Sequence, residues 1–113
     1  MEIYFPDAER RQLFCSESRL RARFGDELAE MICCRLQLLE EAHSVALVPP
    51  DPPIARRCEG GGIFSVSLGN SDRLLFEAVD EQLIPTGIKD LETIHSICVV
   101  AIENFSSSKG LRK

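Results

Sequence analysis

The chain has 113 residues, of which 44% are hydrophobic and 27% charged, the composition of one ordinary globular domain. Thirteen Lys and Arg against 18 Asp and Glu give a net charge of -5, which argues against a general polyanion-binding protein. No apolar run reaches the roughly 18 residues of a membrane span, and the first residues lack a secretory signal. We therefore expect a soluble, cytoplasmic protein with no membrane partner.

The first half of the chain predicts a strand followed by helices. Residues 2–5 favour a short strand, and Asp7 then supplies the cap oxygen of a short helix. A second helix, rich in arginine, is predicted at residues 17–24. The main helix is predicted from Asp26, as its cap, to His43, because its apolar residues follow helical spacing; these are Leu28, Met31, Ile32, Leu38, Leu39 and Ala42.

The second half changes to the pattern of a β-sheet. Four prolines within residues 49–53 end the helical region. Glycine-rich turns of hairpin length favour an antiparallel meander. Residues 1–105 are predicted to form a single domain with a flexible polar tail at 106–113. A loop is expected at residues 80–93, and strands are expected at 54–58, 63–68, 73–79 and 94–102.

This order of elements predicts an α+β fold. An N-terminal strand and two to three helices are expected to pack on a twisted, mainly antiparallel sheet of four or five strands. The helices should cover one face of the sheet and leave the other face partly open.

The five cysteines give no sign of a metal or redox centre. Their number is odd and no C-x-x-C pair is present, which argues against a zinc ribbon and against a thioredoxin-type motif. Four of them are interpreted as small buried hydrophobic residues. The sequence also shows no phosphate-binding glycine motif and no metal-ligand cluster, so we predict neither a cofactor nor a metal site.

Several short segments spread along the chain form a common pattern. They are residues 1–5, Leu28-Ala29 and Arg35-Leu36 in the main helix, residues 55–58, the hairpin of residues 64–68 and 73–77, and residues 97–105. In these segments the chain resembles the HigB-like branch of the RelE/ParE toxin family, some of whose members are labelled plasmid maintenance killer or killer suppression proteins. The resemblance covers about residues 1–105, and its strongest part is the Arg-Leu-Leu-Phe-Glu strand after a short alternating strand.

The resemblance implies a toxin of a bacterial type II toxin–antitoxin pair. RelE and HigB relatives are mRNA interferases, endoribonucleases that cleave mRNA on the ribosome. The implied partners are therefore mRNA on the ribosome and a cognate antitoxin, expected to be a helix-turn-helix protein.

Metal-independent RNA cleavage needs a deprotonated 2′-hydroxyl, a stabilised phosphate charge and a protonated leaving oxygen. By the resemblance, Arg73 stands where the family carries an arginine that contacts the scissile phosphate, and a guanidinium suits bidentate phosphate contact. The alternative is that Arg73 is a solvated strand residue or pairs with Asp72 or Glu77.

Three further residues are candidates for the same site. Arg56 and Arg57 are cationic substitutes for the family's missing basic residues, and strand alternation allows only one of them to share a face with Arg73. His95 near the start of the last strand is a candidate proton carrier, provided that the register of the strand brings it to the site.

The chain departs from the family pattern at three places. Ser65 and Ser67 stand where relatives have two lysines, the basic loop is shortened to residues 59–62, and residues 103–105 replace a frequent Asp-Tyr-His. Three hypotheses stay open: a translation-linked mRNA endoribonuclease or a weakened descendant of one, a ParE-like toxin that binds a target such as DNA gyrase, and a non-catalytic module that binds an antitoxin.

Overall fold

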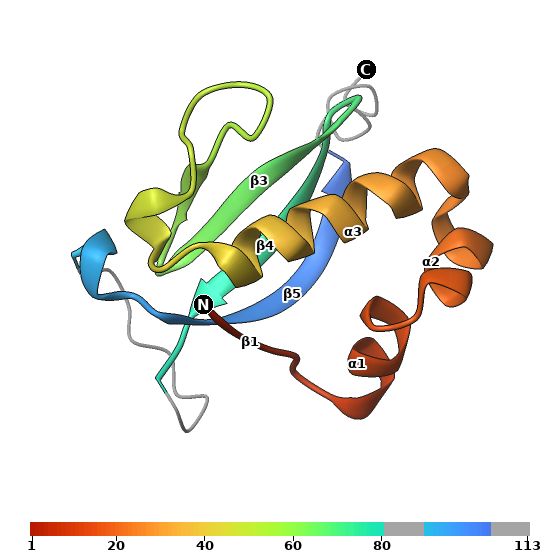
Figure 1. Cartoon of the computed structure of the whole chain (residues 1–113), viewed down its shortest axis with the longest axis horizontal. Helices are drawn as coiled ribbons and strands as arrows, with labels where there is room; N and C mark the ends of the chain where they lie inside the picture. Colours follow the sequence, from red (N-terminus) through yellow and green to blue (C-terminus); the bar gives the residue numbers. More distant parts are fainter. Residues whose placement is uncertain (81–89, 105–113) are drawn as a thin grey trace, which may run out of the picture.

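The chain folds as a run of three helices packed against a five-stranded sheet. The computed structural model describes residues 1–80 and 90–104 (Figure 1). The helices are α1 (Ala8–Phe14), α2 (Glu17–Phe24) and α3 (Asp26–Glu41), with two one-turn 3-10 helices, η1 (Val45–Leu47) and η2 (Leu91–Thr93). The strands are β1 (Glu2–Tyr4), β2 (Arg57–Gly60), β3 (Ile63–Gly69), β4 (Asp72–Ala78) and β5 (Ser96–Asn104). This architecture confirms the predicted α+β class.

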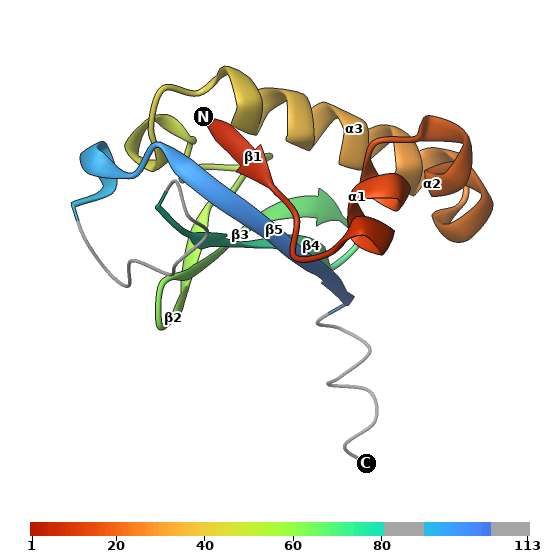
Figure 2. The same cartoon turned by 90° about the horizontal axis from the view of Figure 1, so that it is seen from below.

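The sheet is mainly antiparallel, as predicted. Its strand order is β1-β5-β4-β3-β2, in which β2 to β5 form an antiparallel meander. β1 joins β5 in parallel, with Ile3 opposite Ile97. α3 crosses one side of the sheet, and α1 and α2 gather near the N-terminal end of α3 (Figure 2). The first and last strands are thus neighbours, which ties the start of the chain to the end of the meander.

Local capping explains where the helices begin. The Asp7 carboxylate accepts a hydrogen bond from the backbone N–H of Arg10 at 2.7 Å, as predicted for α1. The Ser16 hydroxyl caps α2 in the same way at 3.3 Å. α3 instead begins after Gly25, whose φ of 88° suits a residue without a side chain, so Asp26 is the first helical residue and not the predicted cap.

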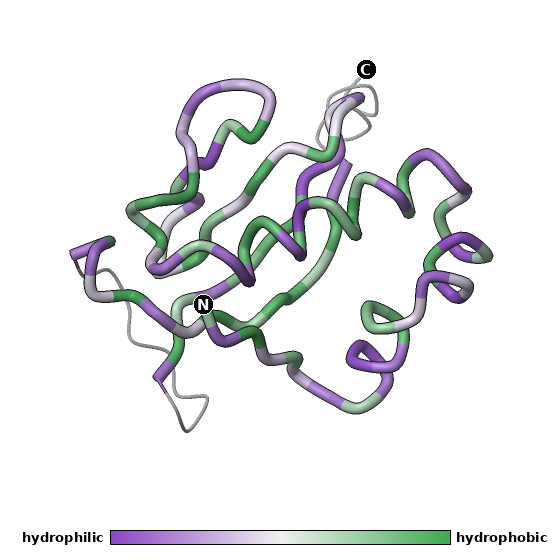
Figure 3. The backbone as a smooth tube through the Cα atoms, in the orientation of Figure 1, coloured by the Kyte–Doolittle hydropathy of each residue, from purple (hydrophilic) through white to green (hydrophobic). Residues whose placement is uncertain are grey.

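The hydrophobic core lies between α3 and the sheet, and hydrophobic stretches along β3, β5 and α3 contrast with the largely hydrophilic α2 (Figure 3). Each fully buried aliphatic or aromatic side chain contributes roughly 1.5–3 kcal/mol to folding. α3 also carries the buried Arg35, whose Nε donates to the Ser67 carbonyl at 2.7 Å and ties the helix to β3. The core includes Ala29, Ile32, Leu39, Phe64, Val66, Leu68, Leu74, Phe76, Ile97 and Val99.

The edge strand β2 begins three residues and ends two residues later than predicted. The strand expected at residues 54–58 begins only at Arg57. The preceding residues form a turn in which the Ala55 N–H donates to the Asp51 carbonyl at 2.8 Å. Ala55 has a φ of 50°, a backbone conformation that a strand does not contain, so the turn delays the strand.

Other element ends shift by two residues. The main helix ends at Glu41 rather than at His43, and the strand predicted at 94–102 begins and ends two residues later. Most of the loop expected at 80–93 and the whole tail expected at 106–113 lie outside the described residues. Within the part of the chain that is described, none of the helices has the length and apolar character needed to cross a membrane.

The cysteines are less buried than interpreted. Cys98 in β5 is buried, burial raises the pKa of its thiol, and Cys33 is half-buried. The other three are exposed, which contradicts the interpretation of four as buried. Cys15 caps the C-terminus of α1, Cys34 lies on an exposed side of α3, and Cys58 lies in the edge strand.

Candidate functional site

Arg73, the predicted phosphate contact, lies in β4 on the face of the sheet turned away from α3. Strand alternation places Phe64 and Val66 in the core beneath α3, and it places Ser65 on the opposite face. Arg73 stands opposite Ser67 in the β3–β4 ladder and so shares that opposite face. It is only 8% exposed, which excludes the alternative of a solvated strand arginine.

The guanidinium of Arg73 is occupied by groups of the chain itself. Its Nε donates to the Ser65 hydroxyl at 2.7 Å. Its Nη2 donates to the carbonyl oxygens of Ala55 and, at 3.3 Å, of Ser65. Through these hydrogen bonds Arg73 connects β4 with β3 and with the turn that precedes β2.

Glu59, predicted only as part of a shortened loop, is the acid of this cluster. One carboxylate oxygen, Oε2, accepts a hydrogen bond from the Ser65 hydroxyl at 2.5 Å and one from Arg57 Nε at 3.1 Å. The same oxygen lies 3.9 Å from Arg73 Nε. The acid beside Arg73 is thus Glu59, and not Asp72 or Glu77. Glu59 follows Arg57 by two residues, so strand alternation was the signal that could have found it.

The four side chains of Arg57, Glu59, Ser65 and Arg73 are called the sheet cluster below. The pKa of Glu59 is lowered, first by the hydrogen bond from Ser65 and then by Arg57 and Arg73, against the opposing effect of burial. Burial lowers the pKa of Arg73, the charge of Arg57 adds to this effect, and Glu59 opposes it. The carboxylate therefore compensates much of the positive charge that the sequence places here.

Arg57 and Arg56 point to different places, because Arg57 is the first residue of β2 and Arg56 belongs to the segment before the strand. Arg57 belongs to the sheet cluster and its side chain is 49% exposed. Arg56 turns away to η1, where its Nη1 donates to the carbonyl oxygens of Val48 at 2.7 Å and Val45 at 2.8 Å. Arg56 thus stabilises the loop before β2 and does not lie in the site with Arg57 and Arg73.

His95 lies at the opposite end of β5 from Arg73. Its Nδ1 is 2.8 Å from the carbonyl oxygen of His43, and the two imidazole rings are 5.2 Å apart. Arg73 pairs with Glu103, eight residues further along, which at about 3.3 Å per strand residue is roughly 26 Å. The register therefore keeps His95 away from the sheet cluster.

The sheet cluster has a limited chemical repertoire. Among its described residues, Glu59 is the one group able to accept a proton, and its lowered pKa makes it a weaker base. Ser65 already donates to this carboxylate, and two arginines are poor proton carriers. No group of three His, Cys, Asp or Glu side chains that could hold a metal ion occurs in the described residues. The charged side chains of the cluster are held by hydrogen bonds and ion pairs with one another.

Comparisons of this chain with protein-family models, with curated proteins and with solved structures give no match.

Proposed function

We propose that this chain is a toxin-type member of a bacterial toxin–antitoxin pair that acts in the cytoplasm by binding its target rather than by cleaving RNA. The resemblance to the HigB-like branch of the RelE/ParE family supports the toxin–antitoxin part. A cognate antitoxin is the partner that this proposal requires.

One observation carries the choice of binding over cleavage. Arg73, the best candidate for a phosphate contact, is buried and uses its Nε and Nη2 as donors to Ser65 and Ala55. A scissile phosphate would have to replace these bonds and approach Glu59, whose negative charge repels it. The described cluster also lacks a side chain suited to protonate the leaving oxygen.

The test is inducible expression in a bacterial host without any antitoxin gene. Growth and the 5′ ends of cellular mRNAs are followed for the wild type, Arg57→Ala and Arg73→Lys. We expect growth to slow without new in-frame mRNA ends, because the protein acts by binding. Arg57→Ala is the matched variant, since it removes an exposed arginine of the same cluster.

The other outcomes decide between the remaining hypotheses. New in-frame mRNA ends that disappear in a variant that is still folded would establish an mRNA endoribonuclease and overturn the binding proposal. Normal growth while folded protein accumulates would overturn the toxin proposal and favour a non-catalytic module that binds an antitoxin. Thermal unfolding of each purified variant shows whether a loss of effect is a loss of fold.

A further inference from the structure

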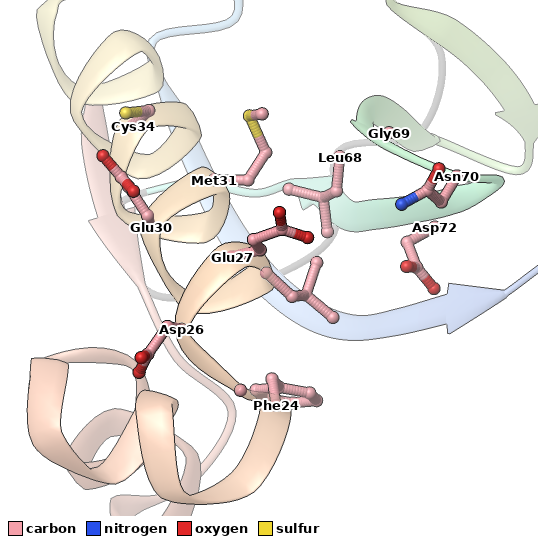
Figure 4. A pocket seen from close by; sticks show the side chains of 12 residues that line it. Phe24, Asp26, Glu27, Glu30, Met31, Cys34, Leu68, Gly69, Asn70 and Asp72 are labelled. Atoms are coloured by element: carbon pink, nitrogen blue, oxygen red, sulfur yellow. The ribbon is translucent and has the colours of Figure 1, made fainter.

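A second surface, on the side of the sheet that α3 covers and not on the side of the sheet cluster, combines an apolar floor with charged walls. It is a groove of about 830 Å³ between the N-terminal half of α3 and the turn that joins β3 to β4 (Figure 4). Leu68 is buried at its base, and three half-buried side chains complete the apolar floor. These three are Phe24, Leu28 and Met31.

All charged side chains among the described residues that line this groove are acidic. Asp26 lies 3.4 Å from Arg21, and Asp72 accepts a hydrogen bond from Asn104 at 2.9 Å. Glu27 and Glu30 are exposed, and within the described part of the chain neither forms an ion pair. Glu27 thus points over the apolar floor and Glu30 lies at its outer rim (Figure 4), and neither has an ion-pair partner among the described residues. We call this surface the acidic groove.

The spacing of the groove residues on α3 is that of a helix stripe. Glu27 and Met31, four residues apart, point toward the β3–β4 turn, and Glu30 and Cys34, also four residues apart, lie along the outer rim of the groove (Figure 4). The opposite wall is the β3–β4 turn with Asn70 and Asp72 (Figure 4). A straight wall facing a turn across an apolar floor has the shape that receives an amphipathic helix.

We infer that the acidic groove docks a basic amphipathic helix of a protein partner. Apolar side chains of that helix would cover the floor, and its Lys or Arg residues would pair with Glu27 and Glu30. The same carboxylates repel nucleic-acid phosphates and acidic peptides, which excludes both as occupants. This inference goes beyond the proposed function, since it holds whether or not the chain is a toxin.

The test uses the full chain and a displayed library of amphipathic helices of about 18 residues, a length that supports helix formation. Apolar positions are fixed, and polar positions vary among Lys, Arg, Glu, Gln and Ser. We expect the selected helices to be strongly basic. Selection of neutral or acidic helices, or of none, would overturn the inference.

Two measurements then locate the binding of a selected helix. Glu27→Gln with Glu30→Gln should weaken it by roughly three- to tenfold, because two exposed ion pairs are lost. Glu40→Gln with Glu41→Gln removes the same charge from exposed residues of α3 outside the groove, and it should leave binding unchanged. Equal effects of the two double variants would show attraction to net charge alone and overturn the inference.

Cysteine alkylation gives an independent location. Cys34 lines the groove, whereas Cys15 and Cys58 are exposed elsewhere. A bound helix should slow the alkylation of Cys34 and leave the other two rates unchanged. Unchanged alkylation of Cys34 at saturating helix would place the binding elsewhere and overturn the inference.

Discussion

The sheet cluster and the acidic groove both gather charged side chains, yet only the groove leaves charge available to a partner. In the sheet cluster, Arg73 donates to the Ser65 hydroxyl, this hydroxyl donates to Glu59, and the Glu59 carboxylate lies 3.9 Å from the arginine. In the groove, Glu27 and Glu30 border the apolar floor, and neither forms an ion pair among the described residues. A charged side chain can bind a partner only to the extent that its charge and hydrogen bonds are not already satisfied within the protein.

The largest expected effect is on the sheet cluster. Arg73→Ala should destabilise the protein by about 3 kcal/mol or more, because the Ser65 hydroxyl and the Ala55 carbonyl lose a buried donor and Glu59 loses the positive charge 3.9 Å away. Urea unfolding measures the change. Arg57→Ala, which removes a half-exposed arginine, should cost under about 1 kcal/mol. Equal stability of the two variants would mean that Arg73 is free for a ligand. The sheet cluster would then not differ from the acidic groove in the availability of its charge.

Arg56 should show an intermediate effect. Arg56→Ala is expected to cost about 2 kcal/mol, since charge-assisted hydrogen bonds to the Val45 and Val48 carbonyls are lost. Amide exchange around η1 should rise in the same variant, because the loop loses its brace. A variant with wild-type stability but an altered cellular effect would instead return Arg56 to the functional candidates.

The order of elements could be predicted because its signals are local. Asp7 and Ser16 stand at helix starts, and alternation in β3 separates Phe64 and Val66 from Ser65 without any tertiary information. Such patterns depend on neighbours in sequence. The α+β class therefore followed from the sequence, together with the antiparallel meander.

The candidate site was harder to predict because its members meet through tertiary structure. Arg56 and Arg57 are adjacent in sequence, but the turn at Ala55 sends one to η1 and the other to the sheet cluster. The register of β5 decides the place of His95, and no local pattern fixes that register. Glu59 was overlooked because a glycine-rich loop was expected where β2 continues.

The acidic groove had no signal of its own. The acids of α3 at spacings of three look like an ordinary solvated helix face. They become the wall of a groove only because the β3–β4 turn at Asn70 approaches the helix. Whether these acids are available to a partner thus depends on the folded structure and could not be predicted from the residue types.

Acidification should affect the sheet cluster through Glu59. Folding lowers the pKa of this carboxyl, so its contribution to stability is fully present above its ordinary value of 4.5 and is lost as the pH falls through the lowered value. Wild-type stability should therefore decline on acidification more steeply than that of Glu59→Gln. Unfolding midpoints across acidic pH measure the difference. Parallel pH curves for the two proteins would show that Ser65 and Arg57 do not hold the ionised form.

The smallest effect is expected at the acidic groove. Glu27→Gln with Glu30→Gln should change the free energy of unfolding by less than about 0.5 kcal/mol, because two small terms oppose each other. The loss of Glu27 removes a favourable charge from the first turn of α3, and the loss of either residue relieves a like-charge pair at three residues' spacing. Urea unfolding checks this. A loss above about 1 kcal/mol would make these acids part of the fold, and the groove would then resemble the sheet cluster.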